Sequence, residues 1–121
     1  MKFSAKKEAL ADKLSLCSSI AEKRQTIPIL SNVLLKANNG NITIVATDLE
    51  RQLSLVVSDC SIADDGETTV SARKLFELIR SVPDETELNF EVIENQLEIS
   101  ALSFQADLAV LPVQDFPFVD L

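Results

Sequence analysis

The chain has 121 residues, 46% of them hydrophobic, which is enough to bury the core of one compact domain. A formal net charge of -8 and a pI near 4.4 exclude a surface that binds nucleic acid over its whole extent, so any contact with DNA must be local. There is no signal-like start and no apolar run near the roughly 18 residues of a membrane span, which favours a cytoplasmic protein.

The first half of the chain predicts a strand, a helix and three further strands. The helix is amphipathic, because Leu10, Leu14 and Cys17 recur at spacings of three and four and share one face. Alternating apolar residues around the turn 38–41 predict a hairpin. The expected elements are strands 1–5, 29–37, 42–47 and 51–58 and the helix 6–21, with a loop at 64–66.

The second half predicts the same order of elements. A helix over 72–82 is stopped by Pro83, and the strands 68–71, 87–93, 96–101 and 104–110 surround it. The two strand-to-helix junctions also read alike, as Phe3-Ser-Ala-Lys-Lys and Val70-Ser-Ala-Arg-Lys. We therefore expect an internal duplication and an α+β fold, with two helices packed on antiparallel sheets.

Basic residues open both predicted helices, where the positive end of the helix dipole disfavours cations. Lys6, Lys7, Arg73 and Lys74 occupy these positions. An external anion would explain them, because a helix start with basic side chains offers amide donors and charge to a phosphate. Arg80 extends the basic face of the second helix. The alternative is an ordinary solvated helix face with one internal ion pair.

Several segments resemble one known family along nearly the whole chain. They are Arg24-Gln-Thr-Ile-Pro-Ile-Leu, Ala46-Thr-Asp-Leu-Glu, Ala72-Arg-Lys, Leu111-Pro and Asp115-Phe-Pro. The chain resembles the first domain of the bacterial DNA polymerase III beta subunit, the beta sliding clamp. The resemblance implies the DNA clamp (processivity) fold, in rings of two chains with three similar domains each. Residues 1–121 would be the N-terminal domain, with the middle and C-terminal domains absent from this chain.

The resemblance also implies a function without catalysis. The ring encircles duplex DNA and tethers the replicative polymerase through weak, sequence-independent contacts. Arg24 and Arg73 match the family's DNA-contacting arginines, and Lys6, Lys7, Lys23 and Arg80 are possible supporting basic residues. DNA polymerase III and the clamp loader would bind regions mostly outside this chain.

Ring closure in this family uses the edge strand that corresponds to residues 103–110. The resemblance implies that Lys74, Phe104 and Leu108 lie at the ring interface of a homodimer. The family usually has basic residues on this strand, whereas Ser103 and Gln105 here are uncharged. Without a partner, the same strand is only an exposed sheet edge.

Two alternatives use other residues. An enzyme could use Asp48 with Glu50, or Asp64 with Asp65, as magnesium ligands, but capping of turns explains these acids better. The chain has no histidine and two glycines, and Cys17 and Cys60 lack a basic partner in sequence, so we expect no catalysis, cofactor or metal. The second alternative is an acidic protein-interaction module that uses an exposed edge strand without DNA contact.

Overall fold

The computed structural model describes residues 1–21 and 28–117. This part of the chain contains nine β-strands, two α-helices and two short 3₁₀ helices. In chain order they are β1 (Lys2–Lys6), α1 (Lys7–Ile20), η1 (Pro28–Ser31), β2 (Asn32–Asn38), β3 (Asn41–Thr47), β4 (Gln52–Val57), β5 (Ser61–Asp64), β6 (Gly66–Ser71), α2 (Ala72–Ser81), β7 (Glu87–Ile93), β8 (Gln96–Ala101), β9 (Phe104–Leu111) and η2 (Val113–Asp115).

The strands form one antiparallel sheet in the order β4-β3-β2-β6-β9-β8-β7-β1-β5. In each half of the chain a strand and a helix precede a run of three strands, with β5 as an additional strand in the first half, so the predicted repeat of element order is present. β1 pairs with β7 of the second half, and β6 pairs with β2 of the first half. Because each half contributes its first strand to the other half's part of the sheet, the two halves interlock around a shared core.

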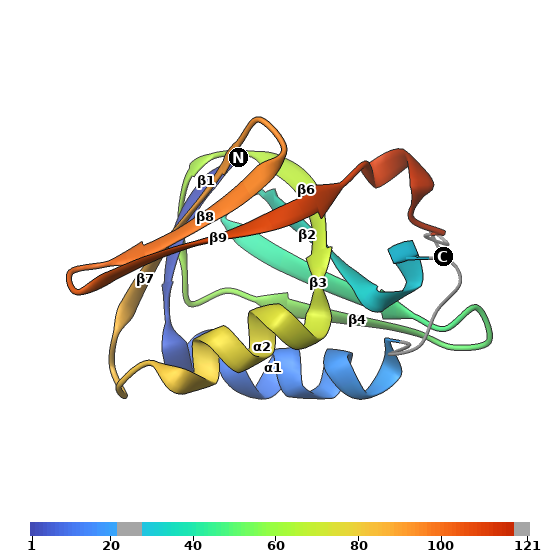
Figure 1. Cartoon of the computed structure of the whole chain (residues 1–121), viewed down its shortest axis with the longest axis horizontal. Coiled ribbons are helices and arrows are strands. Elements are labelled where there is room, and N and C mark those ends of the chain that lie inside the picture. The colour runs from blue at the N-terminus through green and yellow to red at the C-terminus, as the bar shows by residue number, and fades with distance from the viewer. Residues whose placement is uncertain (22–27, 118–121) are drawn as a thin grey trace.

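The main core lies between the sheet and the two helices, which run side by side along one sheet face (Figure 1). The predicted apolar face of α1 is confirmed, because Leu10 and Leu14 are buried, and α2 buries Ile79. The strands contribute Phe3 and Phe90, whose rings stack with centroids 4.6 Å apart. With their apolar sides committed to this core, the helices present their polar sides outward.

A smaller apolar cluster covers the opposite face of β2 and β3. Leu34 and Val45 are paired across these strands and are buried by Ile29, Leu30 and Phe116. The prediction that Ile29 begins a strand is wrong, because the four residues of η1 fold over the sheet as a 3₁₀ turn. Burial of Ile29 and Leu30 against this outer face, rather than strand pairing, explains their apolar character.

The remaining predicted elements agree with the observed ones to within two residues at either end. The sequence missed β5, which pairs with β1 at the far end of the sheet. Its four residues include one partly buried apolar side chain with a large volume, Ile62, and the other three positions are exposed. So short and exposed a strand carries almost no alternation by which to be recognised.

Candidate nucleic-acid interface

The outward faces of the two helices differ in charge. The exposed positions of α2 carry three cations and one anion, whereas those of α1 carry two anions and no cation. In a domain with a net charge of -8, α2 is therefore a local concentration of positive charge that would attract a polyanion. The exposed residues are Glu8, Asp12, Ser15, Leu16 and Ser19 on α1, and Arg73, Lys74, Glu77, Arg80 and Ser81 on α2.

Arg73 and Lys74 lie in the first turn of α2, as predicted. Ser71 caps this helix, because its hydroxyl accepts a hydrogen bond from the Lys74 backbone N–H at 3.3 Å. Both basic side chains are exposed beside the free amides of the first turn. Amide donors together with two cations are the chemistry that a phosphate group requires.

Arg80 lies two turns further along the same exposed face. Its guanidinium carbon is 5.5 Å from the centre of the Phe76 ring, an arrangement that allows a cation–π interaction. Packing on a partly buried ring restrains the long Arg80 side chain without removing its charge from solvent. The basic face of α2 therefore has an exposed cation pair at its start and, near its end, a cation that packs on an aromatic ring.

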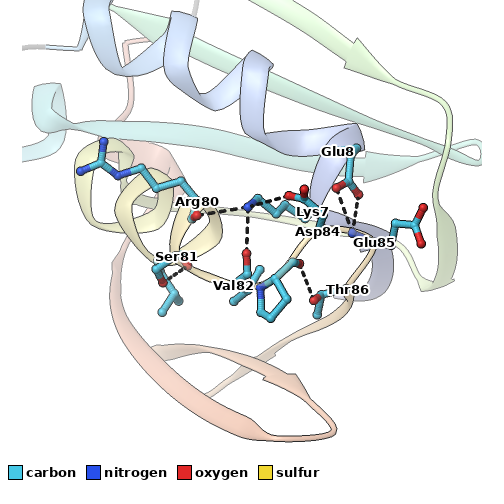
Figure 2. Close-up of polar contacts among 10 residues, drawn as sticks. Lys7, Glu8, Arg80, Ser81, Val82, Asp84, Glu85 and Thr86 are labelled. Atoms are coloured by element: carbon cyan, nitrogen blue, oxygen red, sulfur yellow. Dashed lines mark hydrogen bonds and ion pairs between the residues drawn. The ribbon is translucent and has the colours of Figure 1, made fainter.

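Lys7 is placed differently from the other predicted basic residues (Figure 2). Its ammonium donates hydrogen bonds to the backbone carbonyls of Arg80 at 3.1 Å and Val82 at 2.8 Å, and to the Asp84 carboxylate at 3.3 Å. Only 16% of the Lys7 side chain is exposed. This cation at the start of α1 therefore caps the last carbonyls of α2, where positive charge is favoured.

Glu8 and the backbone at Lys7 secure the loop that follows α2 (Figure 2). The Glu8 carboxylate accepts from the Glu85 N–H, with oxygen distances of 2.9 and 3.2 Å, and the Lys7 N–H donates to the Thr86 carbonyl at 2.9 Å. Glu85 has a φ of 64°, which is unusual for a residue with a side chain. Sequence analysis missed this lock, because its partners lie more than 70 positions apart.

A cavity of about 530 Å³ opens between the start of α2, the end of α1 and β9. Ser71, Arg73 and Lys74 line it on the helix side, and Leu108 lines it on the strand side. Two of the predicted ring-interface residues, Lys74 and Leu108, are thus brought together. Phe104 does not line this cavity and packs, half-buried, against the main core.

The edge of β9 is open over most of its length. β6 pairs with β9 only at Thr69↔Leu111 and Val70↔Val110, because β6 ends at the next residue and the chain turns into α2. The prediction that strand 103–110 is an open edge is therefore wrong at Val110, which pairs with β6. In the described part of the chain, the other six residues of β9, from Phe104 to Ala109, pair with β8 alone.

Three other predicted basic positions complete the set. Lys6 is exposed and occupies the N-cap position of α1, where its side chain makes no capping hydrogen bond. Lys23 and Arg24 lie outside the described residues. Ala21 and Pro28, which flank that segment in sequence, line the same cavity as Arg73 and Lys74.

The acidic residues considered above as magnesium ligands do not form a metal-binding group, and Asp48 has a different role. One Asp48 oxygen accepts from the backbone N–H groups of Glu50 and Arg51, and the other accepts from the Arg51 guanidinium. The Arg51 N–H and guanidinium lower the pKa of Asp48. Asp48 therefore caps a turn, the role that the sequence analysis favoured over metal binding. Within residues 1–21 and 28–117, no three His, Cys, Asp or Glu side chains are grouped to hold a metal ion.

Neither cysteine has the environment of a reactive thiol. Cys17 is fully buried, as predicted, and this burial raises the pKa of its thiol to about 11. Burial also raises the pKa of Cys60, whose sulfur lies 3.4 Å from the Gly40 carbonyl oxygen. Among the described helices, none is long and apolar enough to cross a membrane.

Comparison with known proteins gives a consistent result. A family model described as the DNA polymerase III beta subunit, N-terminal domain, matches residues 1–120. The beta sliding clamp of Pseudomonas aeruginosa is 38% identical over 122 residues, covering 99% of this chain and 33% of the relative. The beta sliding clamp of Escherichia coli is 32% identical over 120 residues, with the same coverage of each chain.

Solved structures agree with this match. The crystal structure of the Pseudomonas aeruginosa DNA polymerase III subunit beta superposes with a TM-score of 0.94 at 36% identity, covering 100% of this chain and 32% of that chain. The Caulobacter crescentus pol III beta structure also gives a TM-score of 0.94, at 34% identity, covering 99% and 32% of the two chains. The predicted clamp fold is confirmed. The chain spans about a third of the length of the curated relatives it matches.

Proposed function

Since the chain belongs to the family of the DNA polymerase III beta subunit N-terminal domain, we propose that it works as the first domain of a sliding clamp. The clamp is a non-catalytic, ring-forming processivity factor of the cytoplasm. Two further domains, outside this chain, complete each subunit of a homodimeric ring. In that ring α1 and α2 face the central hole and the duplex DNA, and the sheet forms the outer wall.

The observation that carries this proposal is the placement of Arg73, Lys74 and Arg80 on one exposed face of α2 in an otherwise acidic domain. A tether that slides needs enclosure and a few weak phosphate contacts, because many strong contacts would hold it in place. Arg73 and Arg24 are the proposed phosphate contacts, with Lys6, Lys23 and Arg80 adding attraction. Lys7 is left out of this set, because its ammonium is committed to the end of α2.

The open edge of β9 is the proposed ring interface. A strand from the last domain of the partner subunit would continue the sheet beside residues 104–109, with Leu108, Lys74 and Phe104 near the contact. Lys74 lies across the cavity from Leu108 and is positioned to meet a carboxylate from that partner. DNA polymerase III and the clamp loader would bind mostly through other domains.

The acidic interaction module without DNA contact uses the same open edge. The relatives that match nearly the whole of this chain are named beta sliding clamps, which does not favour that alternative. The two functions differ in the consequence of removing cations from the helical side, because only the clamp places DNA there.

The test replaces the first domain of the Pseudomonas aeruginosa clamp with this chain and measures retention of the chimera on nicked circular DNA. We expect the chimera to be retained on circles and lost when the DNA is linearised. The Arg24→Ala plus Arg73→Ala variant should be retained less, with a shallower dependence on salt. Each lost phosphate contact should reduce the salt slope of binding by about 0.9.

The matched control is Lys36→Ala, which removes one exposed cation from the opposite face of the sheet. It should behave like the parent chimera. A chimera that assembles as a ring and is never retained on circular DNA would overturn the proposal. Equal loss in the arginine variant and the control would leave the clamp but reject these arginines as contacts.

A further inference from the structure

The open edge of β9 has a defined chemical character on the outer face of the sheet. Along this strand, the side chains of Phe104, Ala106 and Leu108 face inward and are partly buried, whereas Gln105 and Asp107 are exposed. Asp107 is the one charged residue of β9. A strand added to this edge would therefore meet one charge, at one position in the register.

Asp107 ends a row of acidic residues that crosses three strands. It pairs in register with Glu98 of β8, which pairs in turn with Glu91 of β7. Beyond Glu91, Lys2 of β1 lies in register between Glu91 and Asp64 of β5, which ends the row. Like charges directly opposite one another on a sheet destabilise it, and within the described residues no ion pair offsets the β9 end of this row.

Arg73 and Lys74 line the same cavity as Asp107, but among the described residues neither of them forms an ion pair with it. The ion pairs recorded among the described residues, Lys7 with Asp84 and Arg51 with Asp48, involve neither Glu98 nor Asp107. The neighbouring outward rows are uncharged where they reach β9, as Ser100↔Gln105 and Gln96↔Ala109. The charge at the open edge is therefore confined to Asp107 and is exposed to an incoming strand.

We infer that Asp107 is a specificity-determining residue of the β9 edge, which selects a partner strand carrying a lysine or arginine in register with it. The incoming cation would flank the three acidic residues on the β9 side, as Lys2 flanks them on the β1 side. The other face of the partner strand would be apolar, so that it covers Ala106 and Leu108. The inference rests on the proposed ring interface and adds to it the chemistry of the partner strand.

The same feature discourages pairing between two copies of this chain. β9 contains no lysine or arginine, so a second β9 strand offers no cation to Asp107. Two acidic rows would instead approach each other across the new edge. Charged residues on open strands are a common means of preventing such self-association. Asp107 therefore favours a basic partner strand and disfavours a copy of itself.

The experiment titrates the isotope-labelled 121-residue chain with three designed β-hairpin peptides and follows backbone amide shifts by NMR at low salt. The peptides share one apolar face and differ only at the outward position opposite Asp107, which is Lys, Gln or Glu. We expect shifts at Phe104–Ala109, with the Lys peptide binding about two- to fivefold more tightly than the Gln peptide and the Glu peptide most weakly. Asp107→Asn should abolish this ranking.

Asp64→Asn is the matched control, because it removes the same charge from the opposite end of the same row, on β5 beside Lys2 and far from the β9 edge. It should leave the ranking unchanged. The inference is overturned if all three peptides shift β9 with equal affinity, an outcome that keeps β9 as a strand-accepting edge. If no peptide shifts the β9 amides, the proposed ring interface is overturned as well.

Discussion

The two strand-to-helix junctions have nearly the same sequence and opposite environments. At the first, Lys7 is largely buried and its ammonium contacts two carbonyls and a carboxylate. At the second, the equivalent Lys74 is exposed and lines an open cavity beside Arg73. One repeat therefore uses its lysine to hold the fold together, and the other leaves its lysine available to a ligand.

The difference follows from the ends of the helices rather than from the junctions. α1 starts beside the last turn of α2, whose carbonyls have no partners within that helix and attract a cation. At the other end, Lys74 shares the cavity with Ser18 and Ala21 from the end of α1. α1 has 14 residues and α2 has 10, so the two ends of the helix pair are not equivalent. The two similar junctions therefore place their lysines in different surroundings, Lys7 at the end of α2 and Lys74 beside an open cavity.

The largest expected difference between the two junctions is in how much each lysine contributes to the free energy of unfolding. Lys7→Met keeps most of the side-chain volume but removes the ammonium from two carbonyls. We expect the free energy of unfolding to fall by about 1–2 kcal/mol. Lys74→Met should change it by less than about 0.5 kcal/mol, because the side chain is exposed. Urea denaturation of both variants measures the difference, and equal losses would mean that Lys7 is not a structural lock.

A smaller effect concerns the caps of the two helices. Ser71 caps α2 through the Lys74 N–H, so Ser71→Ala should cost about 1 kcal/mol. α1 has Lys6 at its N-cap position, with no side-chain capping bond. Lys6→Ser should supply the missing bond and stabilise the domain by up to about 1 kcal/mol. Thermal unfolding of both variants tests this, and a destabilised Lys6→Ser would show that the N-cap geometry of α1 does not admit a cap.

Sequence patterns predicted the elements that depend on local periodicity. The bounds of β7 and β8 agree with the prediction, and both helices agree to within one residue, because their apolar spacing is regular. The predicted exposed basic face of α2 is likewise present. The repeated order of elements was predicted from the patterns in each half, with the similar five-residue junctions as further support, and it is present apart from the additional strand β5.

The features that the sequence did not predict depend on distant contacts. Ile29 and Leu30 read as a strand, but Phe116, more than 80 positions away, makes their burial on the outer face favourable. The role of Lys7 depends on the position of the last turn of α2, to which no local pattern points. The partial pairing of β9 depends on where β6 turns into α2.

The smallest predicted effect tests whether Glu8 stabilises the first junction through its negative charge as well as through its hydrogen bond to the Glu85 N–H. Glu8 has no equivalent in the second repeat, where Leu75 follows Lys74. Glu8→Gln retains an acceptor for the Glu85 N–H but removes a negative charge from the first turn of α1. We expect a loss of about 0.5 kcal/mol that shrinks in 1 M salt, because the group is exposed and its interaction with the helix dipole is screened.

Asp12→Asn is the control for this charge, since Asp12 lies one turn further along the same exposed face of α1 and outside the first turn. Its substitution should change the free energy of unfolding by less than the Glu8 substitution, at both salt concentrations. If both substitutions lowered the free energy of unfolding equally at both salt concentrations, the negative charge of Glu8 would not contribute, and its carboxylate would act only as a hydrogen-bond acceptor. The difference between the two junctions would then depend on the Lys7 ammonium alone, and the acidic first turn of α1 would not stabilise the helix through its charge.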